Sequence, residues 1–152
     1  MKLQPTDFAF VFIQFVLFFA FIFEISFLQI TLPKFVKIAG FVTSIFGSLL
    51  VVIALLQLNK NLSPFPSPKS DTQLIKNGIY TYIRHPIYTG ILGIVVGYSF
   101  FSGSGYRFLI TLLLLVLFIY KSRYEEKRLL LVFKDYLDYK KKTGRFLPKI
   151  NP

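Results

Sequence analysis

The chain has 152 residues, of which 54% are hydrophobic and 18% aromatic, and its formal net charge is +11. Its apolar residues lie in blocks, several of them near the 20 or so consecutive residues that a membrane-spanning helix needs, so a soluble domain is excluded. The chain has no cysteine and one histidine, which excludes disulfides, thiolate metal sites and a cysteine nucleophile and argues against a histidine-rich metal centre. No metal site is predicted.

Four apolar spans are predicted in chain order, at residues 8–30, 35–58, 86–102 and 106–122. All four are expected to be α-helices, because irregular backbone exposed to lipid would leave its polar groups unpaired. The first span is entered through Pro5-Thr6-Asp7, a helix start, and Pro86 suits the first position of the third helix. The connector at 59–82 contains Ser63-Pro64-Phe65-Pro66-Ser67-Pro68, which is incompatible with a helix interior.

The segment after the last span is predicted to continue as a charged helix. Leu129, Phe133, Tyr136 and Leu137 would share its apolar face, and the opposite face is rich in lysine and aspartate. Such a helix would lie on the membrane surface. The expected fold is therefore an all-α integral membrane protein with about four transmembrane helices and a C-terminal amphipathic interfacial helix, in a single domain over residues 1–152.

Positive charge predicts the orientation of the spans. With a cytoplasmic N-terminus, the outer segments carry Lys34, Lys37 and Arg107, whereas the other basic residues of the chain fall on the inner side, ten of them between Lys121 and Lys149. The positive-inside rule thus places both termini and the segments 59–90 and 121–150 in the cytoplasm. The net charge is explained by topology and contact with anionic lipids, so nucleic acid is not a predicted partner.

Three glycines of the third span recur at helical spacing. Gly90, Gly93 and Gly97 line one face, and Gly40, Ser44, Gly47 and Ser48 form a small-residue face on the second span. Small residues let two helices approach closely, so helix packing is the preferred interpretation for Gly93 and Gly97. Gly90 lies one turn from the Arg84-His85-Pro86 corner, where close approach of a ligand is an equal alternative.

Two acidic features stand out in this apolar chain. Glu125 and Glu126 follow the last span, where an ordinary solvated face is the alternative to a functional site. Glu24 lies within the first predicted span and far from the corner. An ion pair with Lys34, Lys37 or Arg107, or simple protonation of Glu24, is preferred to a catalytic role.

Several motifs together carry a family resemblance. The first reads Gly78-x-Tyr80-x-x-x-Arg84-His85-Pro86-x-Tyr88-x-Gly90, the second Glu125-Glu126-x-x-Leu129-x-x-x-Phe133, and the tail Tyr136-x-x-Tyr139-x-x-x-Thr143-x-Arg145-x-x-Pro148. This pattern resembles the isoprenylcysteine carboxyl methyltransferases, in a wider group with the phospholipid N-methyltransferases. The match runs from Leu74 to Pro148. Lys134 departs from it, since relatives often have Gly or Pro there.

The resemblance implies a membrane enzyme that uses S-adenosylmethionine. It implies a cofactor site formed by Tyr80, His85, Pro86, Tyr88, Gly90 and Glu125, with Arg84, Glu126 and Arg145 as catalytic residues. Arg84 or Arg145 would clamp a carboxylate acceptor, and which of the two does so stays open, as does the oligomeric state. Replacement of His85 or Glu126 by alanine is expected to abolish cofactor binding without unfolding the protein.

The sequence leaves the methyl acceptor open. The preferred function is transfer of a methyl group to the carboxylate of an apolar or lipidated, isoprenylcysteine-like substrate. The alternatives are N-methylation of a phospholipid headgroup and a non-catalytic membrane scaffold. An NADPH-dependent sterol reductase ranks low, because the chain has no dinucleotide-binding fingerprint.

Overall fold

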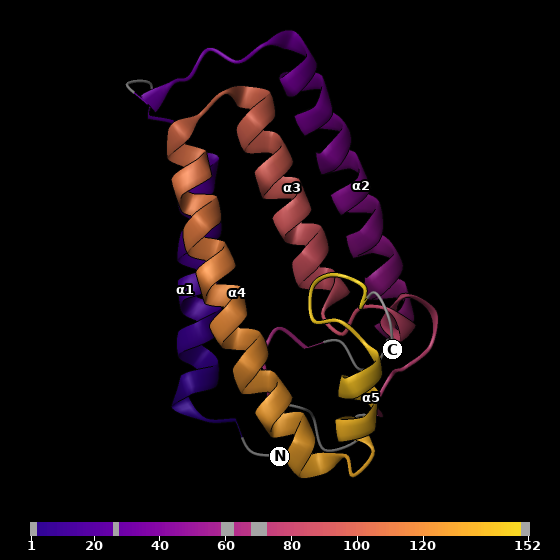
Figure 1. Cartoon of the computed structure of the whole chain (residues 1–152). Coiled ribbons are helices and arrows are strands. Elements are labelled where there is room, and N and C mark those ends of the chain that lie inside the picture. The colour runs from indigo at the N-terminus through magenta and orange to yellow at the C-terminus, as the bar shows by residue number, and fades with distance from the viewer. Residues whose placement is uncertain (1–2, 26–27, 59–62, 68–72, 150–152) are drawn as a thin grey trace.

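The computed structural model describes residues 3–25, 28–58, 63–67 and 73–149. The regular elements in these segments are helices: α1 (Pro5–Ile22), α2 (Lys34–Leu58), the 3-10 helix η3 (Gly78–Thr81), α3 (Pro86–Ser102), α4 (Gly105–Val132) and α5 (Tyr136–Lys142). Consecutive long helices run in opposite directions, with α1 against α4, α4 against α3 and α3 against α2 (Figure 1). The predicted all-α fold is confirmed. Residues 59–62 and 68–72 of the predicted connector, which include Pro68, lie outside the described residues.

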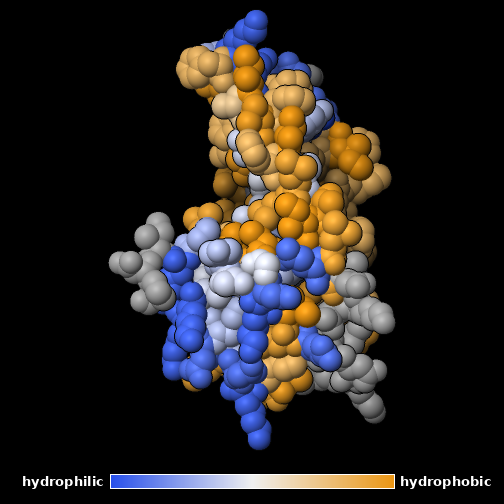
Figure 2. Space-filling model, turned by 90° about the vertical axis from the view of Figure 1, so that its right-hand side faces the viewer, coloured by the Kyte–Doolittle hydropathy of each residue, from blue (hydrophilic) through white to orange (hydrophobic). Residues whose placement is uncertain are grey.

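The apolar surface of this bundle identifies an integral membrane protein. α1, α2 and α4 are long and apolar enough to cross a membrane, whereas α3 is an apolar helix of 17 residues, about 26 Å at the usual rise. Large side chains point outward along α1, where Phe12, Phe15 and Phe19 are 70%, 58% and 63% exposed. Figure 2 shows the helices as a largely apolar surface, with the hydrophilic residues at the two ends.

α1 begins as expected and ends earlier than expected. Pro5 is its first residue, and Asp7 accepts a hydrogen bond from the backbone N–H of Gln4 at 2.7 Å. The helix ends at Ile22 rather than at residue 30. Arg107 of α4 explains the early end, because its guanidinium donates to the carbonyl oxygens of Phe21 and Ile22 and so takes acceptors that a longer helix would use.

Glu24 lies just beyond this end of α1 and has a structural partner. Its carboxylate forms an ion pair with Arg107 at 2.8 Å and accepts a hydrogen bond from the Gln29 side chain. Arg107 also lies over the ring of Tyr98, 5.0 Å from its centroid. The ion pair with Arg107 is therefore confirmed among the partners predicted for Glu24.

The glycines of α3 pack against α2. A Cβ on Gly97 would lie 2.7 Å from the backbone N of Ser44, and one on Gly90 would lie 2.7 Å from the carbonyl oxygen of Gly47. The Ser44 hydroxyl donates to the carbonyl oxygen of Ile94 across the interface. Helix packing is thus confirmed for Gly93 and Gly97. Ser48 differs from the prediction, since it is exposed and its hydroxyl donates to the carbonyl oxygen of Ser44 within α2.

The C-terminal helical segment is broken where the sequence predicts one continuous face. α4 ends at Val132, and α5 begins only at Tyr136. The break changes the register of the side chains, so Tyr136 is 1% exposed and Leu137 is 51% exposed. The apolar side of α5 thus faces the protein through Tyr136 and Tyr139. A surface for the membrane made of Leu129, Phe133, Tyr136 and Leu137 together does not form.

Candidate functional site

The Arg84-His85-Pro86 corner is fixed by the C-terminal segment of the chain. The backbone N–H groups of Arg84 and His85 donate to the carbonyl oxygens of Gly144 and Arg145, at 2.9 and 3.1 Å. Gly144 in turn donates to the carbonyl oxygen of Tyr82. Pro86 then starts α3, where its missing N–H removes no hydrogen bond. The corner and the C-terminal segment therefore form one unit although they are far apart in sequence.

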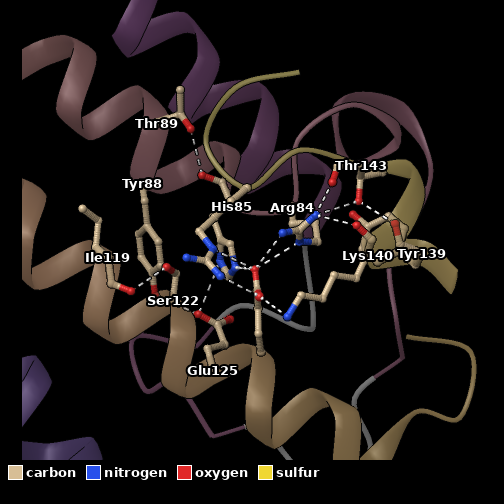
Figure 3. A network of polar contacts seen from close by, with 12 residues as sticks. Arg84, His85, Tyr88, Thr89, Ile119, Ser122, Glu125, Tyr139, Lys140 and Thr143 are labelled. Carbon is tan, nitrogen blue, oxygen red and sulfur yellow. Dashed lines mark hydrogen bonds and ion pairs between the residues drawn. The ribbon is translucent and has the colours of Figure 1, made fainter. Parts of the chain in front are cut away.

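Glu126 of α4 is the centre of a buried ionic cluster at this corner. Its side chain is 1% exposed, and its carboxylate accepts hydrogen bonds from Arg84 Nε at 3.1 Å and from Arg145 Nε and Nη2 at 3.1 and 3.0 Å. Lys140 Nζ of α5 lies 3.0 Å from Glu126 Oε2. Figure 3 shows this network, in which Arg84 and Lys140 approach one carboxylate from different elements. The cluster joins α4, α5, the corner and the C-terminal segment.

Arg84 uses its hydrogen-bonding groups within the protein. Besides Glu126, its guanidinium donates through Nη1 to the carbonyl oxygens of Lys140 and Thr143. Arg145 forms a two-bond fork with Glu126. Both arginines that the sequence predicts as clamps for an acceptor are thus engaged by Glu126.

Tyr88, His85 and Glu125 form the second half of the site. The His85 ring is buried and stacks on Tyr88 at 5.4 Å between centroids, and the Tyr88 ring also stacks on Phe118 at 4.7 Å. The Tyr88 hydroxyl donates to Glu125 Oε2 at 3.0 Å, and His85 Nδ1 lies 3.6 Å from the same oxygen. His85 Nε2 lies 3.4 Å from Glu126 Oε1 but has no hydrogen bond there. The Tyr88 ring is thus held by His85 and Phe118, and its hydroxyl orients the Glu125 carboxylate.

Two tyrosines tie the 3-10 helix to its neighbours. Tyr80 of η3 donates through its hydroxyl to the carbonyl oxygen of Ala54, and its own carbonyl oxygen accepts from the Tyr139 hydroxyl at 2.6 Å. Burial raises the pKa of Tyr139 to about 12, and burial together with the charge of Glu125 raises the pKa of Tyr80 as well. Both hydroxyls stay protonated at neutral pH and keep these hydrogen bonds.

Two cavities adjoin at this site. One has a volume of about 270 Å³ and extends toward Gln14 of α1 and Ile91 of α3. The other, of about 100 Å³, extends toward α5 and the end of α4. Six residues line both cavities: Leu58, Ser63, Tyr80, Arg84, His85 and Glu125. Two ligands that enter from different sides would meet at these shared residues.

The structure brings most of the predicted site residues together. The members that line a cavity are Tyr80, Arg84, His85, Pro86, Tyr88 and Glu125. Glu126 and Arg145 lie behind this wall and line neither cavity. Gly90 faces α2, where a Cβ would lie 2.6 Å from Val51 Cγ2, so its small size is explained by packing rather than by a ligand.

Sequence reasoning missed the roles of three polar residues. Lys121 is 1% exposed and lines the larger cavity, and so does Gln14. Lys140 completes the cluster around Glu126. Lys121 could have been identified from the sequence, because it borders an apolar helical run, and a lysine buried in such a place is costly unless it has a function. Lys140 carries no such signal in its lysine-rich surroundings.

Comparisons with known proteins find a matching family and two curated relatives. The phospholipid methyltransferase family matches residues 35–135. Protein-S-isoprenylcysteine O-methyltransferase of Rattus norvegicus is 32% identical over 117 residues, which are 74% of this chain and 41% of that protein. The enzyme of the same name from Saccharomyces cerevisiae is 34% identical over 91 residues, 54% of this chain and 35% of that protein. The chain therefore spans less than half the length of these relatives.

A solved structure shows the same fold. It is the eukaryotic intramembrane Ras methyltransferase ICMT (isoprenylcysteine carboxyl methyltransferase), with a TM-score of 0.69 and 23% sequence identity. The match covers 99% of this chain and 55% of that protein. The arrangement of the helices is thus shared along nearly the whole of the present chain.

Proposed function

The chain belongs to the phospholipid methyltransferase family, in the group that also contains the isoprenylcysteine carboxyl methyltransferases, and from this premise we propose that it methylates the carboxylate of an apolar or lipidated substrate with S-adenosylmethionine. One observation carries the proposal. Two cavities adjoin at Tyr80, His85 and Glu125, and the larger reaches into the apolar helices.

The groups that line the cavities suit a zwitterionic methyl donor. S-adenosylmethionine supplies an electrophilic methyl group on a positively charged sulfur. Glu125 offers a carboxylate for its ammonium or ribose hydroxyls, and Tyr88 orients that carboxylate by donating at 3.0 Å. Ile87 and Tyr88 lie in the first turn of α3 and line the larger cavity. N–H groups of a first helical turn lack helical acceptors and favour an anion such as the donor's carboxylate.

The protein's contribution to the reaction would be alignment. A carboxylate acceptor is already ionised at pH 7, so no side chain has to remove a proton. Holding acceptor and donor in line contributes roughly 7–11 kcal/mol to such reactions. Arg84, Arg145 and Glu126 would act here as positioning residues, because their cluster holds the corner and the C-terminal segment together. His85 would contact the ligands without taking a proton.

The two cavities suggest separate routes for the two substrates. Gln14 and Ile91 border the larger cavity within the apolar helices, which suits a lipidic acceptor arriving from the bilayer. The smaller cavity borders α5 at the polar end of the molecule, which suits a hydrophilic donor. The basic residues of α5 lie at this same end, so we place the site on the cytoplasmic face.

The test uses the full chain in detergent with methyl-tritiated S-adenosylmethionine and N-acetyl-S-farnesylcysteine. We expect a labelled product that releases volatile methanol in base, as a methyl ester does. Tyr88→Phe removes the hydrogen bond to Glu125 but keeps the stack, so it should weaken S-adenosylhomocysteine binding about tenfold. Tyr120→Phe changes an exposed tyrosine of α4 and should bind normally. Folded wild-type protein that neither binds S-adenosylhomocysteine nor labels any acceptor would overturn the proposal.

N-methylation of a phospholipid headgroup is the second candidate, favoured by the description of the matching family. An amine acceptor must lose a proton, and His85 with Glu125 would then be the groups to receive it. The same assay with phosphatidylethanolamine vesicles distinguishes this function, because an N-methyl label is stable in base. Base-stable label in the lipid, with none in the farnesylcysteine, would replace the carboxyl-methylation proposal by this one.

A further inference from the structure

Lys121 of α4 is a buried cation that faces the larger cavity. It is 1% exposed, and its Nζ donates to Gln14 Oε1 at 2.6 Å and to the carbonyl oxygen of Pro64 at 2.9 Å. Nζ also lies 5.6 Å from the centroid of the Tyr88 ring. Its hydrogen-bond acceptors are thus neutral, and an ammonium has a third N–H to donate.

The two buried arginines Arg84 and Arg107, unlike Lys121, form direct ion pairs. Arg84 lies against Glu126, and Arg107 against Glu24. Within the described segments, by contrast, no carboxylate lies within the 4.0 Å of an ion pair from Lys121 Nζ. The nearby Glu125 is hydrogen-bonded to Tyr88 instead. Glu125 and Asp7 attract the Lys121 ammonium only from beyond ion-pair distance. A buried charge without a direct ion pair is costly, so the surroundings of Lys121 are those of a site completed by an anion.

Arg84 is the other strongly basic residue among those lining the two cavities, and it does not compete for this role. Its guanidinium is bound to Glu126 and to two carbonyl oxygens. Arg145 lines neither cavity. Lys121 is therefore the basic side chain whose charge remains available to a ligand in the described part of the site.

We propose that Lys121 is the anchor for a ligand carboxylate in the larger cavity, held in place by Gln14 and by the backbone of Pro64. This inference rests on the proposed function, which supplies two carboxylates: that of the methyl acceptor and that of S-adenosylmethionine. Lys121 would neutralise the carboxylate and fix its position through a charge-assisted hydrogen bond. An anchored acceptor oxygen attacks the methyl carbon, the carbon–sulfur bond breaks with its electron pair going to sulfur, and no proton moves.

The test compares Lys121→Met with Lys127→Met, which removes the same charge from an exposed position of the same helix. If Lys121 holds the acceptor, its replacement raises the KM for N-acetyl-S-farnesylcysteine at least about tenfold and leaves the Kd for S-adenosylhomocysteine unchanged. If it holds the donor, the Kd for S-adenosylhomocysteine rises instead. Lys121→Arg should restore much of either loss, and Lys127→Met should behave as wild type.

A purely structural role for Lys121 predicts a different pattern. Lys121→Met removes the cost of burying the ammonium but leaves the Gln14 and Pro64 oxygens without their donor, so the unliganded variant should unfold near the wild-type temperature. A lower unfolding temperature with equal changes in both constants, or no change in either constant, overturns the proposal. These outcomes require a wild-type protein that binds S-adenosylhomocysteine. Absence of that binding in folded wild-type protein counts against the proposed function itself.

Discussion

Glu126 connects parts of the chain that are distant in sequence. Arg84 precedes α3, Lys140 belongs to α5, and Arg145 lies in the C-terminal segment, yet all three contact this one carboxylate. Burying a charge is favourable only with well-placed partners, and here one anion faces three cations. Glu125, the preceding residue, faces the cavities instead. Adjacent helical residues point about 100° apart, so the two glutamates have separate tasks.

The different surroundings of the two glutamates lead to a stability prediction. Glu126→Gln leaves three cations around a neutral amide, so the free energy of unfolding should fall by about 3–5 kcal/mol. Glu125→Gln, at a side chain that is 27% exposed, should unfold near the wild-type temperature but lose affinity for S-adenosylhomocysteine. Thermal unfolding in detergent checks both variants. Equal unfolding temperatures for the two would contradict the structural role of Glu126.

The ionic cluster around Glu126 changes one expectation drawn from the sequence. The motif predicts that Glu126→Ala removes cofactor binding and leaves the fold intact. The geometry predicts that the fold itself weakens, because the carboxylate holds the corner to the C-terminal segment. The motif identifies both glutamates, but which of them faces the cavity depends on where the C-terminal segment lies. That long-range arrangement is not encoded in local spacing.

At the scale of elements, the interface of α2 and α3 sets the position of the corner. His85 directly precedes the first residue of α3, so any tilt of α3 against α2 moves the site. The approach is close enough for backbone to touch backbone, since a Cβ on Gly47 would lie 2.6 Å from the carbonyl oxygen of Gly90. The glycine spacing predicts this face correctly. It does not reveal that Gly90 belongs to the same contact as Gly93 and Gly97.

Two glycines of α3 should tolerate a methyl group differently. In Gly97→Ala the new Cβ would meet the backbone N of Ser44 at 2.7 Å, so the helices must separate and the protein should lose about 1–3 kcal/mol of stability. In Gly93→Ala the nearest atom is Gly47 Cα at 3.3 Å, which a small shift relieves. Thermal unfolding of the two variants provides the check. A Gly93→Ala variant less stable than Gly97→Ala would refute this packing.

At the scale of the whole molecule, much of the fold follows from local physical chemistry. Apolar runs predict the helices, and Pro5 and Pro86 mark two of their starts. The misplaced boundaries arise where distant groups intervene. Arg107 accounts for the early end of α1, and burial of Tyr136 accompanies the break before α5. Lys121 was missed for a related reason, because its partners come from α1 and the 63–67 segment.

The distribution of charge between the two ends of the bundle gives a prediction about its sidedness. Lys34, Lys37 and Arg107 lie toward the end that joins α1 to α2, whereas Lys140, Lys141 and Lys142 lie on α5 at the opposite end, which also holds the site (Figure 1). Cytoplasmic segments are enriched in Lys and Arg, so the site should face the cytoplasm. The chain has no cysteine, so an introduced thiol is the only one present.

Thr31→Cys and Leu147→Cys place that thiol at exposed positions of the two ends without changing the charge. In intact cells, a membrane-impermeant maleimide should label Thr31→Cys and leave Leu147→Cys unlabelled. Permeabilised cells should show both labelled, which controls for accessibility. Labelling of Leu147→Cys alone in intact cells would invert the orientation. The hydrophilic methyl donor would then have to reach the site from outside the cytoplasm, and the assignment of the smaller cavity to that donor would lose its support.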